Sequence, residues 1–235
     1  MANTPNNQWF GISMVLVGVI VGYGVAMSSD GSSPTGPSAP TAAVAPPAPS
    51  APPAAPSAKD VKPVDLKRDH IRGNRDANIA LIEYSDYECP FCGRHHPTAQ
   101  ALIDANDDVM WVYRHFPLGF HQNATPLAEG AECAWEQGGD DAFWKFTDLI
   151  FERGADASRI AEYGDESGVD GAKVQDCVDA GTYAQYVKDD MASGSAGGVS
   201  GTPGNIVLNI KTGDSRLVSG AQPLASFQAA VDALK

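Results

Sequence analysis

The stretch Glu83-Tyr-Ser-Asp-Tyr-Glu-Cys-Pro-Phe-Cys-Gly93 decides the fold of this chain. It overlaps the short apolar run at 79–85, which is typical of a buried strand. A helix is predicted over about 90–105, because a proline at an early helical position loses no backbone hydrogen bond. Cys89 and Cys92 therefore stand where a strand passes into a helix.

This location favours redox chemistry at the two cysteines. Cys89 is expected to face the helix N-terminus, whose unpaired N–H groups and dipole stabilise a thiolate. The thiolate is the attacking species in disulfide exchange, so the location controls reactivity directly. Cys92, one turn later, can close a disulfide with Cys89 or resolve a mixed disulfide. We therefore predict that Cys89 is the nucleophile and Cys92 the resolving thiol.

Other uses of these cysteines stay open. One is a purely structural disulfide. Another is a metal site, since Cys89, Cys92, His95 and His96 lie within eight residues. Two cysteines and two histidines so close on one helix could hardly all point at one tetrahedral centre, so neither a metal nor another cofactor is predicted. Gly93 follows Cys92, which excludes a haem-attachment motif.

The remaining pattern predicts an α/β sheet with a helical block inserted in it. A second strand is expected at 109–115, a hairpin at 204–210 and 215–219, and a last helix at 223–234. The helices expected between the strands are broken by Gly or Asp and fall at 125–137, 141–153, 158–167, 171–180 and 182–195.

The stretch at 83–93 resembles the active-site segment of the DsbA-like branch of the thioredoxin superfamily. Three more stretches fit that branch: Arg114-His-Phe-Pro-Leu118, Glu132-Cys133 and Gly198-Val-Ser-Gly-Thr-Pro203. The resemblance covers roughly residues 70–235. It implies a thioredoxin fold in a domain at 61–235, with a helical insertion at about 120–198.

The resemblance also implies roles for individual residues. Pro203, preceded by Thr202, matches the cis-proline that exposes backbone groups to an extended substrate peptide. Glu83 matches the buried acidic residue beneath the disulfide, where a carboxyl can relay a proton. Pro90 and Phe91 lie between the cysteines, where they tune the redox potential and meet the substrate. For Pro203 the alternative is an ordinary trans proline that starts a strand. For Glu83 the alternative is a side chain that points to solvent.

Cys133 and Cys177 lie 44 positions apart in the helical block. Relatives of this type often carry a second cysteine pair there, so the resemblance implies a structural Cys133–Cys177 disulfide. The chain-entropy estimate for such a loop is about 4 kcal/mol of stabilisation. Two buried free thiols are the competing interpretation.

The implied activity is that of an extracytoplasmic thiol:disulfide oxidoreductase, in the first place an oxidase that donates the Cys89–Cys92 disulfide to reduced or unfolded client proteins. A DsbB- or VKOR-like membrane protein is the expected partner for reoxidation. A membrane-tethered reductase or isomerase of the same fold is the first alternative, and a redox-inactive binding or holdase module is the second. A monomer is expected, since no dimerisation module is visible.

Residues 9–27 (WFGISMVLVGVIVGYGVAM) contain no charge over 19 residues. A helix of that length spans roughly 28 Å, close to the hydrocarbon thickness of a bilayer. We expect a transmembrane anchor here, after a short tail at 1–8, and a single-pass cell-membrane protein whose catalytic domain is extracytoplasmic (periplasmic or extracellular). A cleaved signal peptide, and with it secretion, is one alternative, and a buried helix is another.

Residues 28–60 are rich in Pro, Ala and Ser, a composition that cannot bury enough apolar surface to order a chain. They are predicted to form a disordered spacer, with a proline-rich recognition motif as the alternative. Asp30 is the only charged residue before Lys59, so the net charge of −13 lies almost wholly in the domain. That acidity argues against nucleic acid as a partner.

Overall fold

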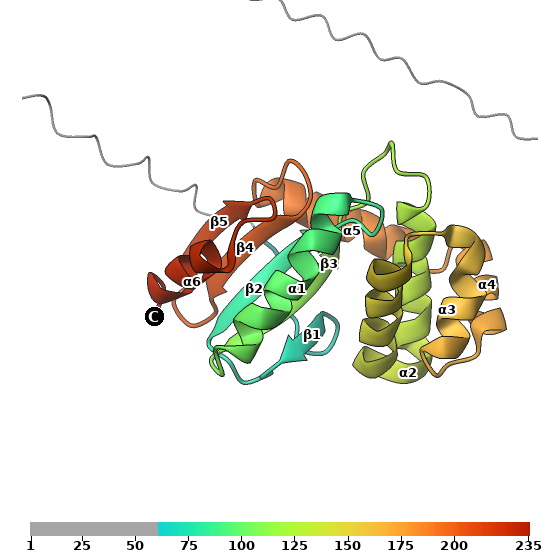
Figure 1. Cartoon of the computed structure of the whole chain (residues 1–235), viewed down its shortest axis with the longest axis horizontal. Helices are drawn as coiled ribbons and strands as arrows, with labels where there is room; N and C mark the ends of the chain where they lie inside the picture. The colour runs from blue at the N-terminus through green and yellow to red at the C-terminus, as the bar shows by residue number, and fades with distance from the viewer. Residues whose placement is uncertain (1–60) are drawn as a thin grey trace, which may run out of the picture. The chain divides into compact units, whose positions relative to one another are not determined.

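The computed structural model describes residues 61–235 (Figure 1). The segments predicted at 1–8, 9–27 and 28–60 lie outside the described residues. Within 61–235 the chain forms a mixed sheet, helices on both of its faces, and a separate block of helices beside it.

The sheet has five strands in the order β1-β3-β2-β4-β5. Its centre is the parallel pair formed by β2 (Ile79–Ser85) and β3 (Val109–His115). The other three pairings are antiparallel, and they involve β1 (His70–Gly73), β4 (Gly204–Asn209) and β5 (Ser215–Ser219). Every residue of β2 and β3 is buried, as expected for strands covered on both faces.

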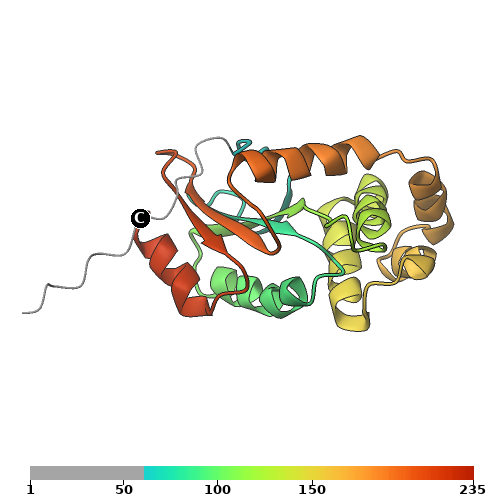
Figure 2. The same cartoon turned by 90° about the horizontal axis from the view of Figure 1, so that it is seen from above.

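Helices cover both faces of the sheet (Figure 2). One face carries α1 (Pro90–Asp104) and α6 (Leu224–Asp232), which contact each other, and the opposite face carries α5 (Ala184–Ala196). The helical block consists of α2 (Ala124–Arg153), a 3-10 turn (Ala157–Arg159), α3 (Ile160–Glu166) and α4 (Gly171–Asp179).

Side chains of β2 alternate between two hydrophobic cores, as the two-residue period of a strand requires. Ile79 and Leu81 belong to the core that contains Leu102 of α1 and Phe227 of α6. Ala80, Ile82 and Tyr84 belong to the core on the other face. By the same alternation, Glu83 lies on the face that α1 covers.

One local feature differs from the sequence prediction, and one predicted pair of helices is confirmed as two arms of a single kinked element. Strand β1 was not expected, because its four residues carry two charged or polar side chains and little periodic signal. The helices predicted at 125–137 and 141–153 are the two arms of α2, which is kinked at Gly139. The positive φ of 67° at Gly139 is a conformation that glycine adopts without strain.

A buried arginine ties the segment before β1 to the sheet. Arg114 of β3 is fully buried and forms a salt bridge of 2.9 Å with Asp69. Its guanidinium also donates to the backbone carbonyls of Lys62, at 2.9 Å, and Pro63, at 3.0 Å. The chain from residue 62 onward is therefore part of the folded domain.

The localisation predicted from the sequence needs correction. None of the helices in residues 61–235 is both long enough and apolar enough to traverse a bilayer. Even α2, with 30 residues, carries charged side chains and packs against its own domain. The segment 9–27, on which the single-pass prediction depended, lies outside the described residues, so that prediction has no support and is withdrawn.

Candidate active site

The turn from β2 into α1 places the two cysteines at the start of a helix. Cys89 is the N-cap residue, with extended backbone dihedrals, and Pro90 occupies the first helical turn. The carbonyl of Cys89 accepts from the N–H groups of Cys92, at 3.0 Å, and Gly93, at 3.2 Å. Both cysteines are free thiols, so this is the dithiol form of the pair.

The environment of Cys89 favours its thiolate. Its side chain is only 5% exposed, and its Sγ lies 3.5 Å from the carbonyl oxygen of Thr202. The Thr202–Pro203 bond is cis, and this loop lies directly beside the sulfur. A hydrogen bond from the Cys92 thiol, helped by the Thr202 side chain and by N–H groups of the first helical turn, lowers the pKa of Cys89 to about 5.

Cys92 has the opposite properties. It is fully buried, and its Sγ accepts from the backbone N–H of Asp86 at 3.5 Å. Burial, followed by the nearby thiol of Cys89 and the charge of Glu83, raises the pKa of Cys92 far above its ordinary value. In the dithiol form the negative charge therefore resides on Cys89 and the proton on Cys92.

Glu83 lies in β2 beneath the cysteines and is fully buried. Its Oε2 accepts a hydrogen bond of 2.9 Å from Nε1 of Trp111 on the neighbouring strand β3. Its Oε1 has no hydrogen-bond partner anywhere in residues 61–235. The structure thus places Glu83 in the interior, and not at the surface, with one oxygen free to exchange a proton.

Asp86 was not singled out from the sequence, yet its buried carboxylate fixes the active-site turn. It accepts from the backbone N–H groups of Glu88, at 2.8 Å, and Leu118, at 2.7 Å, and from Nδ1 of His121, at 2.8 Å. Burial lowers the pKa of His121, but the hydrogen bond and charge of Asp86 outweigh it and raise that pKa. Asp86 therefore ties the loop after β3 to the residues just before Cys89.

Two exposed aromatic rings lie on these two connected segments. Phe91, between the cysteines, is 51% exposed, and Phe120, in the loop fixed by Asp86, is 76% exposed. A hollow of about 220 Å³ is lined by the segment from Val199 to Gly204, by Ser219 at the end of β5 and by Gly220, which follows it. Gly204 is required here, since a Cβ would lie 2.4 Å from Cγ1 of Val199.

The comparisons with known proteins agree with this geometry. A family model described as thioredoxin matches residues 65–233. The chain belongs to the thioredoxin family. Among solved structures, Pseudomonas aeruginosa DsbA2 is 29% identical with a TM-score of 0.64, and it covers 74% of this chain and 97% of its own. A thioredoxin-like oxidoreductase from Silicibacter pomeroyi DSS-3 is 27% identical with a TM-score of 0.61, over 70% of this chain and 91% of its own.

These likenesses confirm the DsbA-like branch of the thioredoxin superfamily that was expected from the sequence. The chain is thus a DsbA-like member of the thioredoxin superfamily. A curated relative, Na(+)/H(+) antiporter NhaA 3 of Salinispora tropica, is 38% identical over 147 residues, which are 60% of this chain. The chain spans only 22% of that relative's length, so the likeness concerns one part of it.

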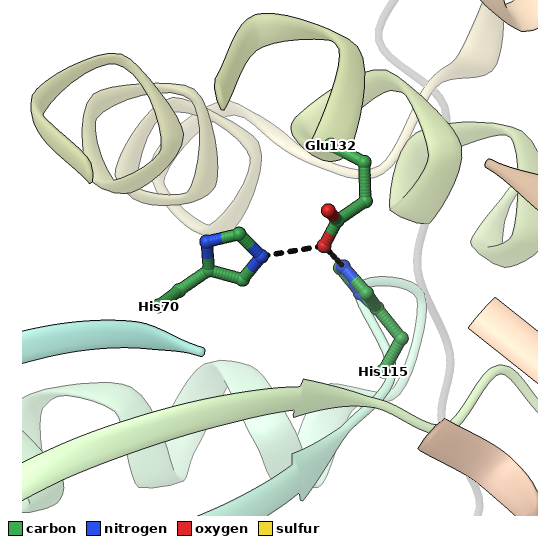
Figure 3. A group of neighbouring side chains, drawn as sticks. All are labelled: His70, His115 and Glu132. Carbon is green, nitrogen blue, oxygen red and sulfur yellow. Dashed lines mark hydrogen bonds and ion pairs between the residues drawn. The ribbon is translucent and has the colours of Figure 1, made fainter. Parts of the chain in front are cut away.

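Two further features stabilise the domain: a disulfide within the helical insertion, and a buried ionic cluster between the insertion and the sheet. Within the insertion, Cys133 of α2 and Cys177 of α4 form a disulfide, the pairing that the resemblance implied. Between the insertion and the sheet lies a cluster of three buried residues, His70 of β1, His115 of β3 and Glu132 of α2 (Figure 3).

In this cluster, Glu132 Oε1 accepts from Nε2 of His70, at 2.5 Å, and of His115, at 2.9 Å, while Oε2 accepts from Arg68 at 2.6 Å (Figure 3 shows the two histidines). Burial alone would raise the pKa of Glu132, but the charge of His70 and the hydrogen bond from His115 hold it well below its usual range. The ring of His70 also stacks on Phe143.

The same three residues have the donor atoms and the spacing of a metal site, since these atoms lie within 4.8 Å of one another. Arg68, however, already places a positive charge on the same carboxylate. A divalent cation here would face that guanidinium, so the cluster fits a charge-compensated hydrogen-bond network better than a metal site.

The Cys89 thiolate gives a direct prediction. We expect the thiolate absorbance of the dithiol form to titrate with a midpoint near pH 5. At pH 6 a pKa near 5 gives Cys89 a thiolate fraction about 300-fold higher than that of a free cysteine. A thiolate of lower pKa is also a weaker nucleophile, which lowers the reaction rate of each thiolate about 40-fold. Iodoacetamide should therefore modify Cys89 about tenfold faster than free cysteine at pH 6. A midpoint above about pH 8 would contradict the assigned environment.

Proposed function

We propose that this chain is a thiol:disulfide oxidase that donates the Cys89–Cys92 disulfide to reduced client proteins. The observation that carries the proposal is the stabilised thiolate of Cys89, whose pKa is lowered to about 5. Interactions that stabilise the dithiol form make the disulfide form a stronger oxidant. A low pKa also makes Cys89 a good leaving group when the client completes its own disulfide.

The reaction proceeds in two exchanges. A client thiolate attacks Cys89 Sγ, a client–Cys89 disulfide forms, and the Cys89–Cys92 bond breaks, with its electron pair going to Cys92. A second client thiolate then attacks the client sulfur of that mixed disulfide. The client disulfide forms and Cys89 leaves as the thiolate, so two electrons have passed from the client to the cysteine pair.

Side chains and backbone around Cys89 supply a docking place for an extended client. The carbonyl of Thr202 lies beside the sulfur, where it can accept from a client N–H group. Phe91 and Phe120 offer exposed apolar rings on the two segments that border the turn. These contacts are backbone-directed or apolar, so they suit unfolded chains of varied sequence.

The dithiol must then be reoxidised by another protein, for which a DsbB- or VKOR-like partner is proposed, with this chain acting as a monomer. A reductase or isomerase of the same fold is the competing proposal, because the side chain of Phe91, unlike its backbone N–H, donates no hydrogen bond to the Cys89 thiolate. A redox-inactive holdase is disfavoured, since a mere scaffold needs no thiolate of this kind.

The equilibrium redox potential of the full chain against glutathione tests the proposal. We expect a value above roughly −200 mV, on a scale where thioredoxin lies at about −270 mV and DsbA at about −120 mV. A value near that of thioredoxin would make the dithiol the working form and would favour the reductase. The same titration of a Cys89→Ser variant, which has no couple to report, supplies the baseline.

A further inference from the structure

A buried histidine, His95, lies on the inner side of the active site. It belongs to α1, three residues after Cys92, and is fully buried. Its Nε2 lies 3.8 Å from Oε2 of Glu83, too far for a direct hydrogen bond but close enough for an ion pair. Within residues 61–235, neither ring nitrogen of His95 has a hydrogen-bond partner.

The surroundings of this pair are almost wholly apolar or aromatic. The ring of Phe227 from α6 lies 4.9 Å from that of His95, centroid to centroid, and Trp111 of β3 donates to Glu83. The other titratable groups near Glu83 are the Cys92 thiol and the hydroxyl of Tyr113, whose pKa burial raises. The pair is therefore enclosed together with Cys92.

A histidine that serves only packing would be expected to satisfy its nitrogens, because unpaired buried polar atoms destabilise a fold. The next residue, His96, pairs one of its two ring nitrogens, since its Nε2 lies 2.8 Å from Oδ1 of Asp148 while its Nδ1 has no partner. At His95 and Glu83, by contrast, three buried polar atoms are left without hydrogen-bond partners side by side. Such an arrangement is explained if the charge of the pair changes during the reaction.

The reaction supplies such a change at Cys92. When a client thiolate attacks Cys89, Cys92 is released as a buried thiolate, which burial and the nearby negative charge of Glu83 disfavour. We propose that Glu83 and His95 share one proton, that this proton passes to the Cys92 sulfur as the disulfide opens, and that it returns when the disulfide closes. His95 is thus the proton partner of Glu83, and the inference depends on the proposed function.

The relay balances over the cycle. Opening leaves a neutral Cys92 thiol and a Glu83–His95 pair with one proton fewer. On reoxidation, Cys92 gives its proton back to the pair and attacks the mixed disulfide at Cys89. No oxidant is needed beyond the one that forms that mixed disulfide.

Reduction of the disulfide form of the full chain by glutathione tests the relay, because Cys92 is the leaving group in this reaction. The rate is followed by tryptophan fluorescence from pH 5 to 9. Dividing it by the glutathione thiolate concentration removes the pH dependence of the attacking thiol, so the remaining pH dependence reports proton delivery to Cys92. General acid catalysis contributes about 10²–10⁴-fold, so His95→Gln should slow the reaction at least about tenfold and change its pH profile. The matched control, His96→Gln, should keep the parent's rate and profile.

Equal profiles for His95→Gln and the parent would overturn the relay and leave the proposed function standing. A parent whose disulfide does not exchange with glutathione would overturn the proposed function itself. If His95→Gln fails to fold, NMR of histidine-labelled parent decides the matter. At one pH the nitrogen shifts of the His95 ring should report a different proton occupancy in the disulfide and dithiol forms, and the same occupancy in both forms would refute the relay.

Discussion

A Cys89→Ser variant is expected to oxidise a reduced client no faster than the uncatalysed background. A Cys92→Ser variant also has no disulfide to donate, but its Cys89 should attack an added disulfide and stop at the mixed disulfide. A serine hydroxyl at position 89 cannot form the thiolate on which exchange depends. In Cys92→Ser, Cys89 still forms a mixed disulfide, but no second thiol resolves it. Mass spectrometry after incubation with glutathione disulfide should detect one stable adduct on Cys92→Ser and none on Cys89→Ser.

The Cys133–Cys177 disulfide, in which Cys133 is buried and Cys177 partly buried, provides an internal control for this experiment. It is remote in sequence from the motif and bridged in the structure, so it should take up no glutathione in either variant. An adduct that maps to Cys133 or Cys177, or a Cys89→Ser variant that still oxidises clients, would show that the assigned nucleophile is wrong.

The second large effect is expected at Glu132. Replacing Glu132 with Gln removes the negative charge that Arg68 and His70 share in the interior. Removing one partner of a buried ion pair leaves the other charge uncompensated, which typically lowers the free energy of unfolding by about 3–5 kcal/mol. We expect a loss of about 3 kcal/mol in urea denaturation, because the amide oxygen can still accept one of the hydrogen bonds.

The pH dependence of stability should change in the same variant. The pKa of His70 in the folded state is raised above 6.5. Protonated His70 therefore contributes fully to the free energy of unfolding below pH 6.5, and this contribution is lost as the pH rises through the folded-state pKa. The folded pKa of Glu132 is lowered below 4.5, so its contribution is complete above pH 4.5 and is lost as the pH falls. The difference between the parent and Glu132→Gln should therefore be largest between pH 4.5 and 6.5.

Glu129, one turn earlier on α2, is the matched control. It is also buried, and burial raises its pKa because the charges of Lys188 and His115 offset that effect only in part. Glu129→Gln removes an unfavourable charge and should keep or slightly increase the stability of the parent. Equal losses for the two variants would show that the effect at Glu132 is one of packing and not of charge.

Much of the fold could be predicted because its signals are local. The apolar runs of β2 and β3, the proline that starts α1 and the glycine breaks between helices each follow from neighbouring residues. The nucleophile was predictable for the same reason, since its activation depends on the helix that begins at the next residue. The resemblance supplied what local pattern could not, namely the partner of Cys133 and the role of Pro203.

The residues that were missed act through contacts between distant segments. Asp86 and His121 are 35 positions apart and meet only because the loop after β3 returns to the active-site turn. His95 was considered only as a metal ligand, because its proximity to Glu83 depends on which face of β2 the helix α1 covers. Strand β1 is short and polar, and it is defined by its pairing with β3 and not by its own composition.

The contacts of Arg114 fix where the folding unit starts. Its guanidinium is sealed in the interior and relies on the carbonyls of Lys62 and Pro63, which precede the first strand by more than six residues. A protein truncated to begin at residue 66 would keep every helix and strand. Its buried Arg114 guanidinium would nevertheless lose two of its hydrogen-bond acceptors. The minimal domain is thus defined by a hydrogen-bonding requirement of one side chain, and it begins at or before residue 62.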